Sequence, residues 1–355
     1  MCDVVNWVRE AVFAASLLFC ALGSPGQSVA NPGAQLPRSA GLAGVSVPQR
    51  AEAPAKVPDQ LVIIDTDVGD DVDDAFAIAL AMQSPEVRIL GIATAWGDTK
   101  LRARLAERFL QETERTDIPV AVGVQTHPGQ GKVSFFSQAS YARRGPEKSW
   151  PDAVDFLLRQ IRDHPGEITL IAIGPETNLG AAIDRDAATF RRLKRGVLMG
   201  GSVYRGYDGF AYPTVAPHAQ PEWNILCDVD AARKVFASGV SLYVMPLDST
   251  QIKLQELERG RIFSNGSALT DALTVLYHQW AYGTRQQTPT LFDVVAVAYA
   301  IRPELCPTKP MRLRVEDDGS TVVEAGEPNV QACLKSDSDA FLEFYLKRVL
   351  ASGRD

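Results

Sequence analysis

The sequence predicts an α/β fold with a single doubly wound, mostly parallel sheet and helices on both faces. Short apolar runs, partly β-branched, alternate along the chain with longer segments whose apolar residues recur at helical spacing. Such alternation is typical of parallel strands that are joined by crossover helices. The chain has 355 residues, of which 46% are hydrophobic, so it is long enough to bury the large core that this fold requires.

The predicted elements follow one another from residue 61 onward. The apolar run 61–64 predicts a strand, and a Gly-containing turn leads from it into the helix predicted at 75–82. Further apolar runs predict strands at 87–94, 118–123, 167–173, 196–199 and 241–245. Apolar residues at helical spacing predict helices at 101–114, 153–164, 230–238 and 291–301. The sequence shows neither an internal repeat nor the G-x-G-x-x-G turn of dinucleotide-binding folds.

The N-terminal residues differ from the rest of the chain. An apolar stretch at 11–22 is too short to cross a bilayer, and Ser28-Val29-Ala30 has the small-x-small pattern of a signal cleavage site. We therefore expect residues 1–30 to be a secretory signal peptide, followed by a flexible linker at 31–58 that is rich in Pro, Gly and Ala. The folded domain would then span residues 59–355. This organisation predicts a secreted or periplasmic protein with no stable membrane association after signal removal.

The charge balance argues against a nucleic-acid partner. The 43 acidic residues exceed the 36 basic ones, which gives a formal net charge of -7. A protein that follows a phosphate backbone needs a basic surface, and this composition does not supply one. We expect a small-molecule ligand instead, and the oligomeric state, including a homo-oligomer, stays open.

The five cysteines leave two interpretations open. If Cys2 and Cys20 are removed with the signal, Cys227, Cys306 and Cys333 remain, and an odd number cannot all pair within one chain. Cys306 and Cys333 lie in the loop-rich C-terminal part, so one interpretation is a disulfide between them. The other is that all three are reduced and mostly buried thiols.

The turn after the first predicted strand is the most informative segment. It contains six aspartates between Asp65 and Asp74. Like charges at close range repel and raise one another's pKa, and a bound cation would remove this conflict. Helix capping would explain one or two of the acids, but not Asp65 and Asp67 at the end of an apolar strand. Since the turn has no His or Cys, we predict a hard cation, calcium or magnesium, bound by oxygen ligands.

This turn and four later segments together resemble the inosine-uridine-preferring nucleoside hydrolase family. The family's N-terminal signature is similar to Asp65-x-Asp67-x-Gly69 followed by Asp73-Asp74-Ala75. The later segments stand in the family's order and are Gly174-Pro175-Glu176-Thr177-Asn178, Leu198-Met199-Gly200-Gly201, Pro221-Glu222-Trp223-Asn224 with Asp228 behind it, and Thr288-Pro289 up to Asp293. The likeness covers about residues 60–302. It implies a nucleoside hydrolase-like fold.

The resemblance also implies an activity and a set of site residues. The activity is the calcium-dependent hydrolysis of the N-glycosidic bond of ribonucleosides, which gives free base and ribose. Calcium would be held by Asp67, Asp74, Asp293 and the backbone carbonyl of Ile173, together with the ribose 2′- and 3′-hydroxyls. Asp67 would act as general base on a calcium-bound water, and Asp65 would orient the other ligands. Substrate binding is implied for Asp73, Asp98, Met199, Glu222 and Asn224.

Two departures from the family pattern affect these roles. The turn carries two more residues than usual before the paired aspartates, so the metal register is open among Asp70, Asp71, Asp73 and Asp74. We prefer Asp73 and Asp74 because the helix follows them directly. No Asn stands between Gly201 and Pro221, where the family usually supplies one for the 5′-hydroxyl, so the resemblance does not imply which nucleoside is preferred.

A third departure concerns the leaving base. Phe292 stands where the best-known members have a His that is thought to protonate the leaving purine. Several side chains are candidates to replace it by proton donation or by stacking on the base, namely His278, His218, Tyr277, Tyr282, Trp280 and Trp223. The sequence does not decide among them.

Two other functions fit part of the pattern. Asp65-Thr66-Asp67-Val68 also matches the D-x-D-x-[TV] start of haloacid-dehalogenase-type phosphatases, in which Asp65 would be the nucleophile and magnesium the metal. That function leaves the later segments unexplained. A non-catalytic nucleoside- or sugar-binding protein would keep the calcium and ribose contacts without turnover.

Overall fold

The computed structural model describes residues 60–126, 136–207 and 218–353. The predicted signal peptide at 1–30 and the linker at 31–58 lie outside the described residues and stay predictions. Within the described ranges, no helix combines the length and apolar character needed to cross a membrane.

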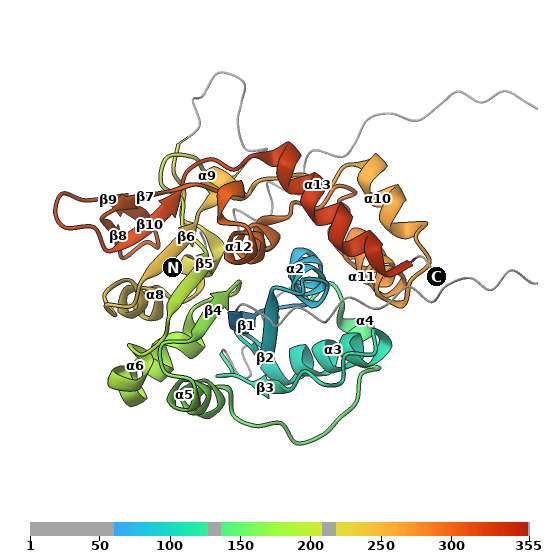
Figure 1. The fold of residues 1–355 in the computed structure, drawn as a ribbon, viewed down its shortest axis with the longest axis horizontal. Helices are drawn as coiled ribbons and strands as arrows, with labels where there is room; N and C mark the ends of the chain where they lie inside the picture. Colours follow the sequence, from blue (N-terminus) through green and yellow to red (C-terminus); the bar gives the residue numbers. More distant parts are fainter. Residues whose placement is uncertain (1–59, 127–135, 208–217, 354–355) are drawn as a thin grey trace, which may run out of the picture. The chain divides into compact units, whose positions relative to one another are not determined.

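The centre of the fold is an eight-stranded sheet with the order β3-β2-β1-β4-β5-β6-β10-β7 (Figure 1). Its strands are β1 (Gln60–Thr66), β2 (Val87–Thr94), β3 (Val120–Val122), β4 (Ile168–Ala172), β5 (Arg195–Met199), β6 (Leu242–Met245), β7 (Thr308–Met311) and β10 (Val330–Cys333). All neighbouring strands are parallel except β10 and β7, which are antiparallel. A separate antiparallel pair consists of β8 (Leu313–Val315) and β9 (Thr321–Val323). The predicted mostly parallel sheet is confirmed.

Helices cover both faces of this sheet, as predicted. They are α2 (Asp73–Met82), α3 (Thr99–Glu112), α4 (Ala139–Ala142), α5 (Ala153–Asp163), α6 (Thr177–Phe190), α7 (Trp223–Cys227), α8 (Val229–Phe236), α9 (Leu247–Thr250), α10 (Glu256–Phe263), α11 (Ala268–Thr284), α12 (Phe292–Ile301) and α13 (Ser338–Val349). Successive residues of a strand point to opposite faces. Val62 and Ile64 of β1 therefore pack into a core with α2, α11, α12 and α13. Ile63 between them packs into a second core with α5, α6 and α8.

The strand order reverses between β1 and β4, and this point positions the site. From β1 the chain adds β2 and β3 on one side, whereas β4, β5 and β6 extend the sheet on the other. In open α/β sheets, ligands bind beyond the carboxyl ends of the strands at such a reversal. Helices α2 and α12 pack against each other, and each is buried along almost its whole length. Their N-terminal turns carry the aspartates that the sequence analysis singled out.

A disulfide connects Cys306 to Cys333, with a Cα–Cα distance of 5.7 Å. It ties the segment after α12 to β10, the strand next to β6. Cys227 is free and half-buried. Of the two interpretations of the cysteines, the structure therefore contains the disulfide rather than three reduced thiols.

Candidate active site

Arg102 of α3 organises the acidic loop between β1 and α2. Its side chain is fully buried, and its guanidinium donates hydrogen bonds to the carbonyl oxygens of Asp67, Val68 (3.2 Å) and Trp96 (2.8 Å). It also forms an ion pair with the Asp70 carboxylate at 3.0 Å. One cation thus fixes both the path of the loop and one of its acids. Arg102 was not among the predicted site residues, because it is one of three arginines in α3 and no motif distinguishes it from the others.

Gly69 lets a second segment close against the same loop. Its φ is +127°, and a Cβ atom at this position would lie 1.6 Å from Cε2 of Phe136. In the residues that follow Phe136 in the chain, the Gln138 N–H donates to the Gly69 carbonyl (3.1 Å), and the Ser137 hydroxyl donates to the Asp70 carbonyl (2.7 Å). A side chain at Gly69 would therefore displace the segment that holds the loop.

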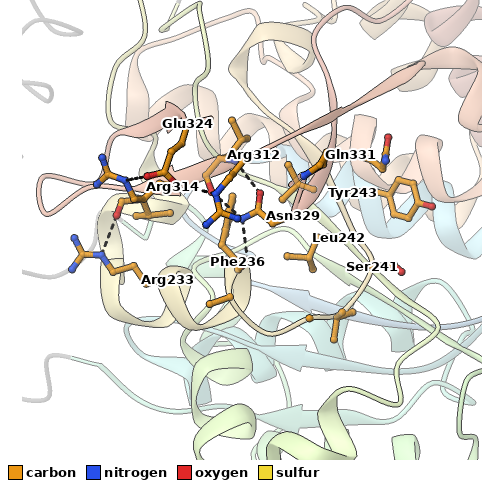
Figure 2. Close-up of a pocket in the computed structure, with 17 residues that line it drawn as sticks. Arg233, Phe236, Ser241, Leu242, Tyr243, Arg312, Arg314, Glu324, Asn329 and Gln331 are labelled. Atoms are coloured by element: carbon orange, nitrogen blue, oxygen red, sulfur yellow. Dashed lines mark hydrogen bonds and ion pairs between the residues drawn. The ribbon is translucent and has the colours of Figure 1, made fainter. Parts of the chain in front are cut away.

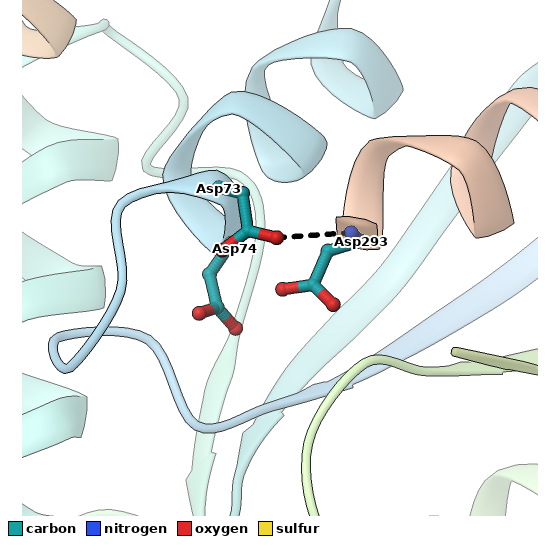
Figure 3. Close-up of side chains that lie close together, drawn as sticks. All are labelled: Asp73, Asp74 and Asp293. Atoms are coloured by element: carbon teal, nitrogen blue, oxygen red, sulfur yellow. Dashed lines mark hydrogen bonds between the residues drawn. The ribbon is translucent and has the colours of Figure 1, made fainter. Parts of the chain in front are cut away.

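The carboxyl groups of Asp73, Asp74 and Asp293 form one buried cluster (Figure 3). Each offers an oxygen atom, and these three atoms lie within 4.8 Å of one another. The Asp293 backbone N–H donates to Oδ2 of Asp73 (3.0 Å), and the Thr66 hydroxyl donates to Oδ1 of Asp74 (2.5 Å). Among the described residues, this is the one group of acidic, His or Cys side chains that is close enough to hold a metal ion.

The cluster is short of positive charge. Burial raises the pKa of Asp73, Asp74 and Asp293 well above the ordinary value, and neighbouring carboxylates raise it further. Burial also raises the pKa of Asp67 to about 7, although the nearby Arg102 guanidinium lowers it. A cation at the cluster would supply the missing charge, and the all-oxygen donor set fits a hard ion such as calcium or magnesium.

Of the aspartates that could have joined the cluster, the structure places the preferred pair, Asp73 and Asp74, in it. Asp73 and Asp74 meet Asp293, whereas Asp70 pairs with Arg102. Oδ1 of Asp71 accepts from the Val72 N–H at 2.7 Å. The extra residues of the loop thus have partners of their own, and the pair that directly starts α2 joins the cluster.

Asp65, Asp67 and Ile173 lie where β1 and β4 end side by side. The Ile173 N–H donates to the Asp65 carbonyl (2.8 Å), and Oδ2 of Asp65 accepts from the Asn178 amide (2.8 Å). Burial raises the pKa of Asp65 to about 7, and the Asn178 hydrogen bond lowers it. A Cβ atom on Gly174 would lie 2.7 Å from the Asp67 nitrogen. The absence of a side chain at Gly174 therefore lets the backbone after Ile173 lie close to Asp67.

Met199, Glu222 and Asn224 come together at the end of β5. The Asn224 amide donates to the Met199 carbonyl at 3.0 Å. The Glu222 carboxylate accepts from the backbone N–H groups of Gly201 (3.0 Å), Asn224 (3.0 Å) and Ile225 (3.2 Å). All three predicted side chains are buried, and the orientation of the Glu222 carboxylate is fixed by these backbone donors.

This arrangement of acids agrees with the sequence relationships of the chain. A sequence model of the inosine-uridine preferring nucleoside hydrolases matches residues 62–343. The chain belongs to this family. The haloacid-dehalogenase-type alternative is therefore wrong, since that family match covers most of the chain.

Named relatives of this nucleoside hydrolase are similar over most of their length. The chain is 34% identical over 283 residues to uridine nucleosidase 1 of Arabidopsis thaliana, which covers 74% of this chain and 80% of the relative. It is 29% identical over 320 residues to the pyrimidine-specific ribonucleoside hydrolase RihA of Enterobacter sp. (strain 638). This match covers 81% of this chain and 97% of the relative. A solved plant nucleoside hydrolase superposes with a TM-score of 0.73 at 26% identity, covering 83% of this chain and 100% of that one.

In this nucleoside hydrolase, the side chains of α11 that could protonate the leaving base or stack on it lie on two faces of the helix. Trp280 is buried, and its side chain lies close enough to the Asp71 carboxylate to lower the pKa that burial raises. His278 and Tyr282 each stand two residues from Trp280, a rotation of about 200° around the helix. His278 is exposed and lies against Phe263, and Tyr282 is 75% exposed. The structure therefore brings Trp280 to the acidic loop, and it does not bring His278 or Tyr282 there.

The other candidates and Asp98 also have defined surroundings. The Tyr277 hydroxyl donates to the Gln287 carbonyl (2.7 Å), and His218 is exposed. Asp98 is exposed and caps α3, where its carboxylate accepts from the Leu101 N–H at 3.0 Å. Asp98 thus has a local capping role, and a contact with the sugar stays a prediction.

An aromatic pair stands where the family has its His. The rings of Phe292 and Tyr207 are 6.1 Å apart, edge to face, directly before Asp293. The Tyr207 hydroxyl accepts from the Trp223 N–H at 2.9 Å, which places Tyr207 between Phe292 and the start of α7. Tyr207 was not among the predicted site residues, because nothing in the sequence pattern predicts this contact.

A separate surface pocket lies at the opposite end of the strands (Figure 2). Ser241 and Leu242 line it where β6 begins, whereas the carboxyl cluster lies beyond the strands' other ends. Its arginines have acidic partners, since Arg312 and Arg314 both pair with Glu324 at 3.0 and 3.3 Å. The pocket is therefore not part of the candidate active site.

Proposed function

We propose that this nucleoside hydrolase cleaves ribonucleosides with a calcium ion that is held by Asp67, Asp74, Asp293 and the Ile173 carbonyl. The observation that carries the proposal is the meeting of Asp293 with Asp73 and Asp74 in one buried carboxyl cluster. Calcium binds carboxylate and carbonyl oxygens. Burial and neighbouring carboxylates raise the pKa of Asp74 and Asp293, so a bound cation would stabilise their ionised forms.

When bound, the ion would attract the vicinal hydroxyls of the ribose and make a nearby water more acidic. Asp67, at the end of β1, then accepts the proton of the attacking water as general base. Arg102 favours the charged form of Asp67, since its guanidinium lowers the pKa that burial raises. The carboxylates around the sugar stabilise the positive charge that develops at the anomeric carbon.

The remaining side chains hold the substrate on both sides. Asp73 accepts from a ribose hydroxyl next to the cluster, and Glu222 and Asn224 hold the sugar from the β5 side. Because three backbone N–H groups fix the Glu222 carboxylate, its orientation is set before the substrate arrives. Trp280 is the proposed stacking partner of the base, since it is the α11 candidate that reaches the acidic loop.

The names of the relatives suggest the first substrate to assay. One relative is a uridine nucleosidase and another is described as pyrimidine-specific. We propose uridine as the first substrate, within a panel of purine and pyrimidine ribonucleosides. The product assay should detect both free base and ribose.

The proposal is tested by calcium removal and by Asp67→Asn. Chelation should abolish turnover of the purified protein, and added calcium should restore it. Asp67→Asn should lower kcat by a factor on the order of 10³ even at saturating calcium, because it removes both a proposed calcium ligand and the general base. If calcium binds but no nucleoside of the panel is cleaved, the protein is a nucleoside- or sugar-binding protein and the proposal fails.

We also propose export through residues 1–30. Expression of the full chain in a secreting host should place the protein outside the cytoplasm, with an N-terminus after Ala30. Retention of the intact N-terminus inside the cell would contradict this proposal.

A further inference from the structure

Glu176 has a buried carboxyl group that lacks a hydrogen-bond donor. Its side chain is 0% exposed, and among the described residues neither of its carboxyl oxygens has a hydrogen-bond partner. Glu176 immediately precedes α6, yet its side chain does not cap that helix. An ionised carboxylate in such surroundings would lose its hydration without compensation, so the charged form is strongly disfavoured.

The charged groups that act on Glu176 are themselves acidic. They are Glu222, Asp228 and Asp65, in decreasing order of effect. A Cβ atom on Gly200 would lie 3.5 Å from Oε1 of Glu176 and 3.6 Å from Oε2 of Glu222, so both carboxyl groups meet the same bare stretch of backbone. Burial raises the pKa of Glu176 well above its ordinary value, and Glu222 raises it further.

The hydrogen-bond donors near Glu176 donate to neighbouring carboxylates instead. Asp65 accepts from Asn178 at 2.8 Å, and Asp228 accepts from the Thr177 hydroxyl at 2.7 Å. Burial raises the pKa of Glu222 to about 7, and its three backbone N–H donors lower it, whereas Glu176 has no such donor, so Glu222 is the member of the pair that ionises first. Within the described residues, the group close enough to hold a metal ion does not include Glu176.

We propose that Glu176 is a neutral carboxylic acid that donates a hydrogen bond to Glu222 and thereby positions the Glu222 carboxylate for the substrate. The inference rests on the proposed role of Glu222 in holding the sugar. Glu176 is a positioning residue, because it acts on the substrate only through Glu222. When Glu176 loses its proton, two adjacent carboxylates repel each other, and Glu222 loses one of the donors that orient it.

The consequence is a pH-dependent KM. Sugar binding should weaken as the pH rises and Glu176 ionises, whereas kcat should change less, because Asp67 and the carboxyl cluster lie outside this contact. Glu176→Gln provides the decisive comparison, since an amide keeps an N–H donor at this position and cannot ionise. Glu176→Leu removes the donor at every pH.

Steady-state kinetics of the calcium-saturated enzyme from mildly acidic to alkaline pH test the inference. We expect the KM of the wild type to rise on the order of tenfold at alkaline pH, which corresponds to the loss of one hydrogen bond to a charged group. Glu176→Gln should have a KM close to the acidic wild-type value at every pH. Glu176→Leu should have a KM raised by a similar factor throughout. A Glu176→Gln profile that follows the wild type would overturn the inference.

Infrared difference spectroscopy gives a readout that does not depend on activity. Near neutral pH, the C=O band of protonated carboxyls in the wild type should contain a component that is lost at alkaline pH and is missing in Glu176→Gln, whereas the components of the other carboxyl groups with raised pKa should stay in both proteins. The presence of this component in Glu176→Gln at unchanged intensity would show that another group holds the proton. Thermal unfolding confirms that each variant is folded, and if Glu176→Leu fails this test, the wild type and Glu176→Gln still decide the question.

Two further variants separate the possible failures. Glu107 is also a buried glutamate, but it pairs with Lys148 at 2.6 Å, so Glu107→Gln should leave the pH profile of KM unchanged. Glu222→Gln tests the proposed sugar contact itself. If Glu222→Gln leaves KM unchanged, the role of Glu222 is wrong. If it raises KM while the Glu176 variants do not, only the inference about Glu176 fails.

Discussion

The backbone N–H of Asp293 donates a 3.0 Å hydrogen bond to Oδ2 of Asp73, although 220 residues separate them along the chain. The bond joins the first turn of α12 to the first turn of α2. Since both helices are almost wholly buried, their packing fixes the distance between the aspartates. The carboxyl cluster therefore forms only in the folded protein, so the free energy of ion binding adds to the free energy of folding.

Asp74→Asn and Asp293→Asn should weaken calcium binding and catalysis together. Each replaces a charged oxygen donor by a neutral one, and we expect calcium affinity and kcat to fall by a factor on the order of 10² or more. The metal-free variants should be more stable than the metal-free wild type, because each lacks one buried, mutually repelling carboxyl group. Isothermal titration with calcium and thermal unfolding in chelator measure the two effects.

The matched control for these variants is Asp152→Asn. Asp152 caps α5 from the surface, where its carboxylate accepts from the Asp155 N–H at 2.9 Å. Its substitution should change stability by less than about 1 kcal/mol and leave calcium affinity unchanged. If Asp293→Asn bound calcium as tightly as this control, Asp293 would not be a ligand.

Without calcium, the stability of the protein should fall as the pH rises. The pKa of Asp65 and Asp67 is raised to about 7, and unfolding returns it to the ordinary value near 4. Such a group holds a proton in the native state that unfolding releases, so its contribution is complete below pH 4 and is lost as the pH rises through 7. We expect a loss on the order of a few kcal/mol between pH 5 and 8.

Calcium should reverse this dependence, because the bound ion stabilises the ionised carboxylates. Thermal unfolding from pH 5 to 8, with calcium and with chelator, should give curves that diverge as the pH rises. Calorimetric titration in buffers of different ionisation enthalpy should show proton release on calcium binding. Parallel unfolding curves and no proton release would mean that the carboxyl cluster does not take up the ion.

Arg102→Lys should disorder the acidic loop despite keeping the positive charge. The guanidinium serves the carbonyl oxygens of Asp67, Val68 and Trp96 at once, and a lysine ammonium cannot span these acceptors. We expect the variant to lose about 3–5 kcal/mol of unfolding free energy and to bind calcium weakly. Arg108→Lys is the control, since Arg108 forms a more exposed pair with Glu112. A wild-type calcium affinity in Arg102→Lys would contradict this role.

Much of the sheet could be predicted because its strands are covered on both faces. Such strands contain near-continuous apolar runs, as residues 61–64 of β1 and 170–172 of β4 do, and the predicted ranges place them within a few residues. The strands β7 to β10 lack this signal. They are short and partly exposed, and β7 contains Pro310 at the antiparallel edge of the sheet.

The site was predictable where it depends on local spacing and unpredictable where it depends on packing. The adjacency of Asp73 and Asp74 at a helix start pointed to their joint role. The buried ion pair of Arg102 and the missing donor at Glu176 arise from contacts between distant segments. A single sequence does not encode such contacts as a pattern, so neither residue stood out.

Removal of the disulfide should lower the stability of the domain without affecting catalysis directly. Cys306 and Cys333 are 27 residues apart, and in the loop-entropy model the cross-link contributes about 3.5 kcal/mol. The double variant Cys306→Ser, Cys333→Ser should therefore melt about 5 °C lower than the wild type. Its kcat and KM at low temperature should match the wild type, because the bond lies outside the carboxyl cluster. Cys227→Ser is the control, since this thiol is free, and its melting temperature should not respond in the same way. Equal melting temperatures of the double variant and the wild type under oxidising conditions would show that the bond does not form in solution.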